Sequence, residues 1–431
     1  MNAVETAVNH DDLEPARVRT MDLAIIGAGP VGLEAAARAT RAGLATVLFD
    51  AGAVADHVRA WGWLRLFSPF EWNAGPAGLE LLGGREAELP AAGALLTGTE
   101  LRTRYLLPLA ESLRSRVDLR EGARVRDVAR ADRLKGEALG DAARAEQPFR
   151  LLVEENGAET EVFARAVFDC SGTYGRPNWA GPGGTPAIGE RSARRAIEYR
   201  VRDVLGAQRG RYAARRTLLL GSGHSAATTA CALAALARSV PGTRFTWASR
   251  EAHGTPLRAI PDDPLPERVR LTRRANAIAA EPAPGCEWLS RSRLLAVAQR
   301  DSRGFEVDLE VAGNVRRDRF DRIVANVGYE PDDRLYRQLQ VHVCYASHGP
   351  MGVSAALLAA QGPQGDAPSD CCIGAEALGP ETLRNPEPGF FILGAKSFGK
   401  NSAFLMRAGF EQVADAFSLL GWNAARATGA R

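Results

Sequence analysis

The chain reads DLAIIGAGPVGLEAAARA from Asp22 to Ala39, and this stretch decides the fold. An apolar strand leads into a turn with three glycines, Gly27, Gly29 and Gly32, and an alanine-rich helix follows. Gly27 permits the tight turn, Gly29 lets the backbone approach a pyrophosphate, and Gly32 allows the helix to pack closely on the strand. The phosphates of a dinucleotide would then lie at the amino-terminal end of the helix.

A second strand, residues 45–49, brings an acidic residue to the same site. Asp50 stands 18 residues after Gly32, where a carboxylate can bind a ribose that has free hydroxyl groups. The glycine pattern alone is weak evidence, but strand, turn, helix, second strand and terminal acid together predict a dinucleotide site.

A second unit of the same kind begins near the middle of the chain. It reads RTLLLGSGHSAATTACALAAL from Arg216 to Leu236, again a strand, a turn and a helix. The turn is formed by Gly221, Gly223, His224, Ser225 and Ala226. Alanine replaces the third glycine, and it is small enough for close packing. We expect His224 to have a positional role near a phosphate or a ribose.

The next strand of this second unit, residues 244–248, ends in Ser249 and Arg250 instead of an acid. An acid would repel a 2′-phosphate, whereas an arginine can bind it with two hydrogen bonds. We therefore predict NADPH as the coenzyme of the second unit. The alternative is that Arg250 is a solvated residue at the end of a strand.

The composition excludes several classes of partner. The chain has 431 residues, 45% of them apolar, and 54 basic against 51 acidic residues give a net charge of +3. This balance indicates neither nucleic acid nor an anionic membrane as a partner. No run approaches 18 apolar residues, so we expect no membrane span. Residues 1–20 are polar and lack the apolar core of a secretion signal, so we expect a disordered tail and a cytoplasmic protein.

Alternating strands and helices with two glycine turns predict an α/β fold with two Rossmann-like dinucleotide-binding domains, the second inserted into the first. The expected boundaries are 21–190 for the first part of the first domain, 191–332 for the NADPH domain and 333–431 for the second part. Further strands are expected at 117–120, 123–125, 149–153, 161–164, 166–169, 304–309, 322–329 and 390–394. A surface excursion is expected at 129–147, a loop-rich segment at 341–388 and a final helix at 402–420.

An aromatic segment, residues 61–73, contains three of the seven tryptophans. Such a segment either forms core or lines a pocket for a ring-shaped ligand, and both can hold. Arg65, Ser68 and Asn73 are its candidate polar contacts to a ligand, although each could be structural.

In this order, the landmarks resemble the flavoproteins with two dinucleotide-binding domains, in particular those similar to flavin-containing monooxygenases and thioredoxin reductases. The resemblance covers nearly the whole chain after residue 20. It implies FAD at the first turn, where Pro30 is typical, and NADPH at the second. Cys170-Ser171-Gly172 is similar to the first crossing between the domains, and residues 326–331 are similar to the second. The candidate cofactor-binding residues are Gly27, Gly29, Pro30, Gly32, Asp50, Arg65, Ser68, Val125, Gly172, Gly221, Gly223, His224, Ser225, Ala226, Ser249, Arg250, Gly328, Gly394, Lys396 and Asn401.

The chain departs from the family near its end. Where the family has an aspartate after a glycine, this chain reads Gly394-Ala395-Lys396-Ser397. Lys396, Ser397 or Asn401 could replace that acid by hydrogen bonding to the ribityl or phosphate oxygens of FAD, and a plain surface position for Lys396 is the alternative. The final helix would point its amino-terminal end at the flavin. The long histidine-containing motif of classical flavin monooxygenases has no clear copy here.

The cysteines bear on where the electrons go after NADPH has reduced the flavin. No Cys-x-x-Cys pair is present, and the adjacent Cys371 and Cys372 could form only a strained disulfide. Monooxygenation of a small sulfur or nitrogen substrate with molecular oxygen is therefore the leading hypothesis. A flavin reductase or dithiol oxidase, and a redox sensor that binds the cofactors without turnover, are the alternatives. A homodimer is one assembly that the chain allows.

Three further residues raise the question of a metal site. His342, Cys344 and His348 lie close together in the sequence. Their spacing, with or without Cys371 and Cys372, matches no standard zinc pattern. We therefore expect no metal.

Overall fold

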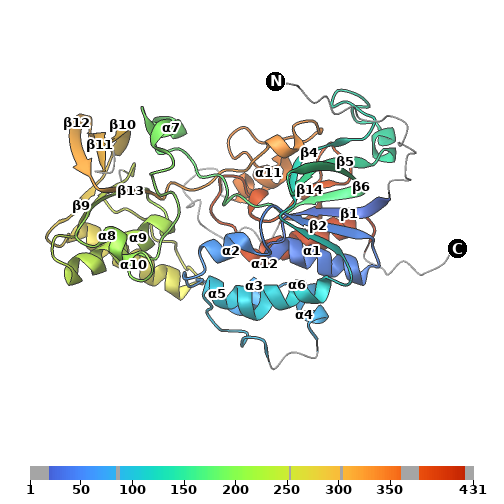
Figure 1. The fold of residues 1–431 in the computed structure, drawn as a ribbon, viewed down its shortest axis with the longest axis horizontal. Helices are drawn as coiled ribbons and strands as arrows, with labels where there is room; N and C mark the ends of the chain where they lie inside the picture. The colour runs from blue at the N-terminus through green and yellow to red at the C-terminus, as the bar shows by residue number, and fades with distance from the viewer. Residues whose placement is uncertain (1–18, 84–87, 252–253, 301–303, 361–377, 423–431) are drawn as a thin grey trace, which may run out of the picture.

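The architecture was analysed in a computed structural model, which describes residues 19–83, 88–251, 254–300, 304–360 and 378–422. Figure 1 shows two units side by side, joined by extended segments between them. The predicted tail falls almost wholly in residues 1–18, outside the described residues, and Thr20 already begins the first strand.

The first unit is built on one mixed sheet. Its strands are β1 (Thr20–Ile26), β2 (Thr46–Asp50), β3 (Asp118–Glu121), β4 (Arg124–Arg130), β5 (Phe149–Glu155), β6 (Ala158–Asp169) and β14 (Phe390–Ile392). The order is β3-β2-β1-β6-β5-β4, and β14 pairs with the end of β6. Strands β3, β2, β1, β6 and β14 are parallel, whereas β5 pairs antiparallel with β6, and β4 pairs antiparallel with β5.

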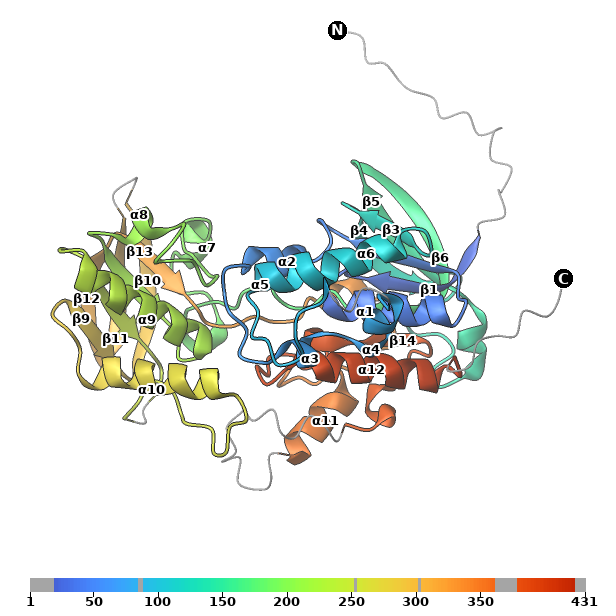
Figure 2. The ribbon, with the colours of Figure 1, turned by 90° about the horizontal axis from the view of Figure 1, so that it is seen from below.

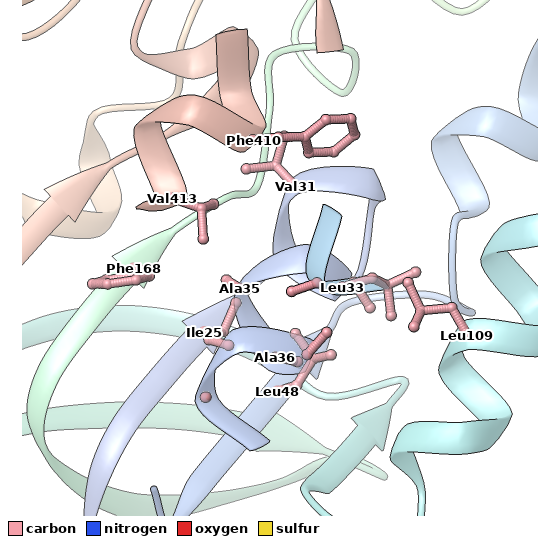
Figure 3. Close-up of a cluster of buried hydrophobic side chains, with 14 of the residues drawn as sticks. Ile25, Val31, Leu33, Ala35, Ala36, Leu48, Leu109, Phe168, Phe410 and Val413 are labelled. Atoms are coloured by element: carbon pink, nitrogen blue, oxygen red, sulfur yellow. The ribbon is translucent and has the colours of Figure 1, made fainter. Parts of the chain in front are cut away.

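Helices pack around this sheet, with α1 directly on β1 and β2. They are α1 (Pro30–Arg41), α2 (Asp56–Ala60), α3 (Phe70–Asn73), α4 (Pro76–Leu81), α5 (Gly98–Leu101), α6 (Leu107–Leu113), α11 (Met351–Ala360) and α12 (Met406–Leu419). Figure 2 shows α1 running between α6 and α12, and α1 contacts both. In Figure 3, Leu33 of α1 lies toward Leu109 of α6, and Val31 lies beside Phe410 of α12.

The core forms where α1 lies on the sheet, because α1 presents small residues to the strands. Ala35 and Ala36 are fully buried and lie near Ile25 of β1 and Leu48 of β2 in the same cluster. Alanine favours helix and leaves room for close approach, so the helix can lie directly on the parallel strands. This packing positions the turn before α1 at the carboxyl ends of β1 and β2.

The second unit repeats the plan. Its parallel sheet has the order β13-β7-β8-β9, and a separate antiparallel sheet has the order β10-β11-β12. The strands are β7 (Arg216–Leu220), β8 (Arg244–Ala248), β9 (Cys286–Leu289), β10 (Ser292–Gln299), β11 (Phe305–Val311), β12 (Asn314–Phe320) and β13 (Arg322–Ala325). The helices are α7 (Glu190–Ala193), α8 (Arg209–Tyr212), α9 (His224–Ser239) and α10 (Pro266–Ala280). The predicted α/β class with two Rossmann-like units is confirmed.

The two crossing segments lie against each other. The backbone amide of Asn178 donates to the carbonyl of Gly328 at 3.0 Å, and that of Glu330 donates to Arg176 at 3.0 Å. Pro177 and Tyr329 form an antiparallel bridge between these bonds. Ile188 pairs with Ala296 of the second unit, and the boundaries given from the sequence stay a prediction.

Several local predictions differ from the structure. Of the strand predicted at 322–329, only residues 322–325 form β13. Residues 161–164 and 166–169 belong to one strand, β6, since the exposed Arg165 fits the outward phase of the alternation. The loop-rich segment contains helix α11. The final helix begins at Met406, four residues after the predicted start.

A further difference concerns the surface excursion at 129–147. Its first residues end β4, and Arg144 is 1% exposed because it pairs with Glu387 at 2.9 Å. Arg130 binds the same carboxylate at 2.7 Å, and that side chain is equally buried. A buried carboxylate shared by two arginines therefore fastens the excursion to the segment that precedes β14.

Candidate functional site

The first glycine turn has the geometry that its sequence predicts. Gly27 has a φ of 103°, and a Cβ there would lie 2.7 Å from the carbonyl oxygen of Cys170. A Cβ on Gly32 would lie 1.9 Å from the carbonyl oxygen of Gly27. By contrast, a Cβ on Gly29 would meet nothing within 4 Å. The turn is therefore closed on its inner side and open at Gly29, where a phosphate group would approach the backbone.

Helix α12 covers the side of this turn. Pro30 begins α1, where a missing N–H costs nothing. The side chain of Val31 fits between two glycines, since a Cβ would come within 3.1 Å of it from Gly394 and within 2.6 Å from Gly409. The amide of Gly394 donates to Oε1 of Gln412 in α12 at 2.8 Å. Gly394 is thus a packing residue beside the turn, and a role in binding cofactor stays a prediction.

Asp50 lies beside the turn at the end of β2. Its carboxylate accepts hydrogen bonds from the backbone amides of Ala28 at 2.9 Å and Gly52 at 2.8 Å. Burial raises the pKa of this carboxyl, while the two amide bonds and the nearby His57 act in the opposite direction. The acid is therefore held in place by the turn itself, next to the position where a ribose would follow the phosphates.

Lys396 is not a surface residue, so that alternative is wrong. Its ammonium group lies 2.6 Å from Oδ2 of Asp169, with the two side chains 1% and 0% exposed. It also donates to Oγ of Ser171 at 3.2 Å, and Oγ of Ser171 donates to Oδ1 of Asp169 at 2.6 Å. Through its contacts with Asp169 and Ser171, the lysine therefore fixes the start of the first crossing segment. Sequence reasoning missed Asp169, although an acid at the end of an apolar strand was a visible signal.

The aromatic segment contributes side chains to the core, and its polar side chains bond to each other and to the backbone. The buried Ser68 donates its hydroxyl to Oδ1 of Asn73 at 3.0 Å, and Nδ2 of Asn73 donates to the carbonyls of Ser68 and Pro69. Arg65 donates to the carbonyl of Leu95 at 2.6 Å. These bonds give each of the three side chains a structural partner, and ligand contact by Arg65 and Ser68 stays a prediction.

Two further candidates lie on other elements. Val125 of β4 is half-buried and packs on the sheet face opposite to α1. The side chain of Asn401 accepts from the amide of Ala403 at 2.9 Å and lines a cavity between the units.

The second turn repeats the geometry of the first. Gly221 has a φ of 127°, and a Cβ there would lie 2.2 Å from the carbonyl oxygen of Asn326. A Cβ on Gly223 would meet nothing within 4 Å, and Ala226 is fully buried beneath the turn. The open glycine again precedes a helix, α9, whose amino-terminal N–H groups have no partners within the helix.

A cavity of about 1080 Å³ opens in front of the second turn. Its wall includes Gly221, Ser222, Gly223, His224 and Ser225 from the turn, Asn178 and Gly328 from the crossings, Phe67 from the aromatic segment, and residues 399–402. The ring of Phe67 meets that of His224 edge-on, with centroids 5.9 Å apart. Sequence reasoning missed Phe67, because nothing in the pattern says that residues 67 and 224 meet.

Ser249 and Arg250 have different positions. Ser249 is 1% exposed and its hydroxyl accepts from Nε1 of Trp288 at 3.1 Å. It is therefore a packing residue, and direct contact with a coenzyme stays a prediction. Arg250 is exposed and lines the cavity.

The described cysteines differ in environment. Burial raises the pKa of the thiols of Cys170, Cys231 and Cys286, for Cys170 well above its usual range. The Cys344 thiol is the exception, since hydrogen bonds from Ser347 lower its pKa. Cys371 and Cys372 lie outside the described residues. Among the described side chains, no three histidine, cysteine or acidic residues gather as a metal site would require.

The described helices do not indicate a membrane span. None of the helices in the described ranges combines the length and the apolar composition that crossing a bilayer requires.

The comparisons with known proteins agree on the fold. No protein-family model and no curated protein sequence matches the chain. Solved structures do match over 94% of its length. They include bacillithiol disulfide reductase from Staphylococcus aureus, with TM-score 0.64, 15% identity and 100% of that chain covered.

Two more of these structures represent different activities. Ornithine N-hydroxylase from Kutzneria matches with TM-score 0.59 and 15% identity, over 94% of this chain and 100% of that one. Thioredoxin reductase from Lactococcus lactis matches with TM-score 0.58 and 16% identity, over 94% and 99%. The fold of the flavoproteins with two dinucleotide-binding domains, expected from the sequence, is confirmed. At these identities the likeness establishes the fold alone.

Proposed function

We propose that this protein is an oxidoreductase that binds FAD in its first unit and takes electrons from NADPH bound in its second. One observation carries the proposal: Gly29 and Gly223 each face open space immediately before a helix, while the glycines behind them are closed by backbone. Two such openings in one chain fit two pyrophosphate groups. The Kutzneria structure of the same fold contains reduced FAD, NADP⁺ and L-ornithine.

The residues fit the two cofactors in different ways. Asp50 beside the first turn would accept hydrogen bonds from the ribose of FAD, and Gly172 and Gly328 would let the crossings pass close to it. Arg250 beside the second turn would bind the 2′-phosphate that distinguishes NADPH from NADH. When bound, the cofactors supply hydride transfer from nicotinamide to flavin, and the protein orients them.

Monooxygenation of a small sulfur or nitrogen compound is the reaction that we favour. NADPH, a proton, molecular oxygen and the substrate would yield NADP⁺, water and the oxygenated substrate. This reaction requires no protein thiol. Three of the described cysteines form the reactive thiolate poorly, because burial raises their pKa values. The sequence also has no Cys-x-x-Cys pair.

A thiol oxidoreductase is the second candidate, and Cys344 is the observation in its favour. Its lowered pKa favours the reactive thiolate. Its loop reaches the cavity wall, since the amide of Lys400 donates to the carbonyl of Ser347 at 2.7 Å. Disulfide reductases occur among the proteins of this fold.

The first prediction separates these activities. Reduced protein should transfer oxygen to a small amine or thioether, measured as product formed per NADPH consumed. Substitution of Cys344, Cys371 and Cys372 by serine should leave this ratio and the rate within about twofold, because thiols take no part. Cys231→Ser, at a buried position in α9, is the control for the effect of a serine substitution alone.

Other outcomes would identify other functions. Loss of turnover in the folded triple variant would establish the thiol reaction instead. NADPH oxidation that yields peroxide and no oxygenated product would establish an oxidase. Tight binding of both cofactors without any turnover would leave the redox sensor. Protein that cannot bind FAD would contradict all of these functions.

A further inference from the structure

Three arginines from two separate segments surround one small pocket at the edge of the second unit. Arg250 follows β8, Arg291 precedes β10, and Arg293 lies within β10. Gly183, from the loop after the first crossing, completes the wall of this pocket of about 360 Å³. Arg250 and Arg293 also line the larger cavity in front of the second glycine turn. The three-arginine pocket is therefore continuous with the place proposed for the coenzyme.

Backbone hydrogen bonds hold the two segments together. The amide of Ser292 donates to the carbonyl of Ser249 at 2.8 Å, and that of Arg291 donates to Glu251 at 3.1 Å. These bonds stand on either side of Arg250, so they fix it next to the start of β10. Arg291 has a φ of 47°, in the left-handed region that costs energy for a residue with a side chain.

The position of Arg293 within β10 determines the side of the strand to which its side chain points. Ser292 and Leu294 are buried beneath the strand. Because successive residues of a strand point to opposite faces, Arg293 projects on the outer side, and Arg291, which precedes the strand, lines the same pocket. Both are exposed, so their guanidinium groups share the same solvent-facing region as Arg250.

The charges of this cluster are poorly compensated by the protein itself. Arg293 lies 3.5 Å from Glu310, with 56% of the arginine side chain exposed. Within the described ranges, Arg250 and Arg291 have no carboxylate partner. Three guanidinium groups against one carboxylate repel one another, and a dianion among them would relieve that repulsion. A phosphate also offers three terminal oxygens to the paired N–H donors of arginine.

We propose that Arg250, Arg291 and Arg293 together bind the 2′-phosphate of NADPH, and that Arg291 and Arg293 decide the preference for NADPH over NADH. The inference rests on the proposed function, since it assigns the adenosine end of the same coenzyme. It moves the decision from Arg250 alone to Arg291 and Arg293, which lie 41 and 43 positions later in the sequence. The diphosphate would lie at the second glycine turn and the 2′-phosphate in the three-arginine pocket.

The test measures binding of two nucleotides to the full-length flavoprotein by calorimetry. The probes are 2′,5′-ADP, which carries the 2′-phosphate, and 5′-AMP, which lacks it. In Arg291→Ala/Arg293→Ala the affinity for 2′,5′-ADP should fall roughly 10- to 100-fold, while that for 5′-AMP should change less than about twofold. KM for NADPH should rise in parallel, with kcat/KM for NADH unchanged.

The control is Arg300→Ala, an exposed arginine just beyond the other end of β10 that pairs with Glu306 at 2.8 Å. It should bind both probes as the wild type does. The single variants Arg291→Ala and Arg293→Ala provide the same test if the double variant does not fold, and each should weaken 2′,5′-ADP alone.

Three outcomes would overturn the assignment. Unchanged 2′,5′-ADP affinity in the double variant would exclude the β10 pair. Equal losses for both probes would mean a general effect on the nucleotide site. A wild type that is reduced by NADH as readily as by NADPH would remove the coenzyme preference while leaving the oxidoreductase intact. A wild type that binds neither probe and is reduced by neither coenzyme would contradict the proposed function itself.

Discussion

At the scale of single residues, Lys396 and Asp169 form a buried ion pair in the first unit. The pair is almost fully buried and its atoms lie 2.6 Å apart. The ring of Tyr336 lies 5.1 Å from the same ammonium group. Two opposite charges removed from water in this way stabilise each other, because loss of either one leaves the other buried without a counter-charge. The pair also fixes Ser171, and so the start of the crossing between the units.

Lys396→Met should therefore destabilise the protein by about 3–5 kcal/mol, because it leaves Asp169 charged and buried without its cation. Urea unfolding followed by circular dichroism would measure the loss. Adding Asp169→Asn to that variant should recover part of it, since the uncompensated charge is removed. Lys400→Met is the control: this lysine is 38% exposed and lies 3.6 Å from Glu330, so its loss should cost less than about 1 kcal/mol. Equal losses for Lys396→Met and Lys400→Met would contradict the buried pair's importance.

At the scale of elements, the turn between β1 and α1 separates packing from binding. A Cβ on Gly32 would meet backbone 1.9 Å away, whereas one on Gly29 would meet open space. Gly29 has a φ of −83°, which alanine also adopts. Two glycines of one motif therefore have different reasons to lack a side chain.

Gly32→Ala should destabilise flavin-free protein by about 1–3 kcal/mol or more through overpacking, while Gly29→Ala should stay within about 0.5 kcal/mol of the wild type. Gly29→Ala should nevertheless lose FAD, measured as flavin absorbance per protein, because the methyl group occupies the phosphate's approach. Gly223→Ala is the matched control from the second turn, where a Cβ is equally unobstructed. It should keep FAD and lose NADPH. Full flavin content in Gly29→Ala would refute the assignment of the first turn.

The elements also show how far the sequence could reach. Both glycine turns and the strands and helices beside them were predictable, since periodicity and turn chemistry are local signals. Helix α11 was missed in a segment rich in glycine and proline. The pairing of Arg144 with Glu387 joins residues 243 positions apart, and backbone hydrogen bonds bring Arg291 to the segment that contains Arg250. Such partners are chosen by tertiary packing, which no local pattern encodes.

At the scale of the whole molecule, the two units have separate sheets and separate cores. The two crossing segments pair with each other between them. A ligand that binds one unit should therefore stabilise that unit more than its neighbour, because linkage acts through the structure that binds.

Hydrogen–deuterium exchange tests this separation. With 2′,5′-ADP at about 100 times its dissociation constant, binding should stabilise the second unit by about 2.7 kcal/mol. Exchange should slow in peptides from β7, α9 and β13, and it should stay unchanged in peptides from β1, β2 and β6. The same slowing in both units would mean that they unfold as one body.

Strand β6 gives this arrangement a consequence for how the chain is made. Its first half pairs with β5 and its end pairs with β14, which begins at Phe390. The whole second unit lies between these two strands in the sequence. During synthesis the second unit can therefore close its sheet once β13 has left the ribosome, while the first unit still lacks β14 and α12. The part of the chain that is translated first would be the last to complete its core.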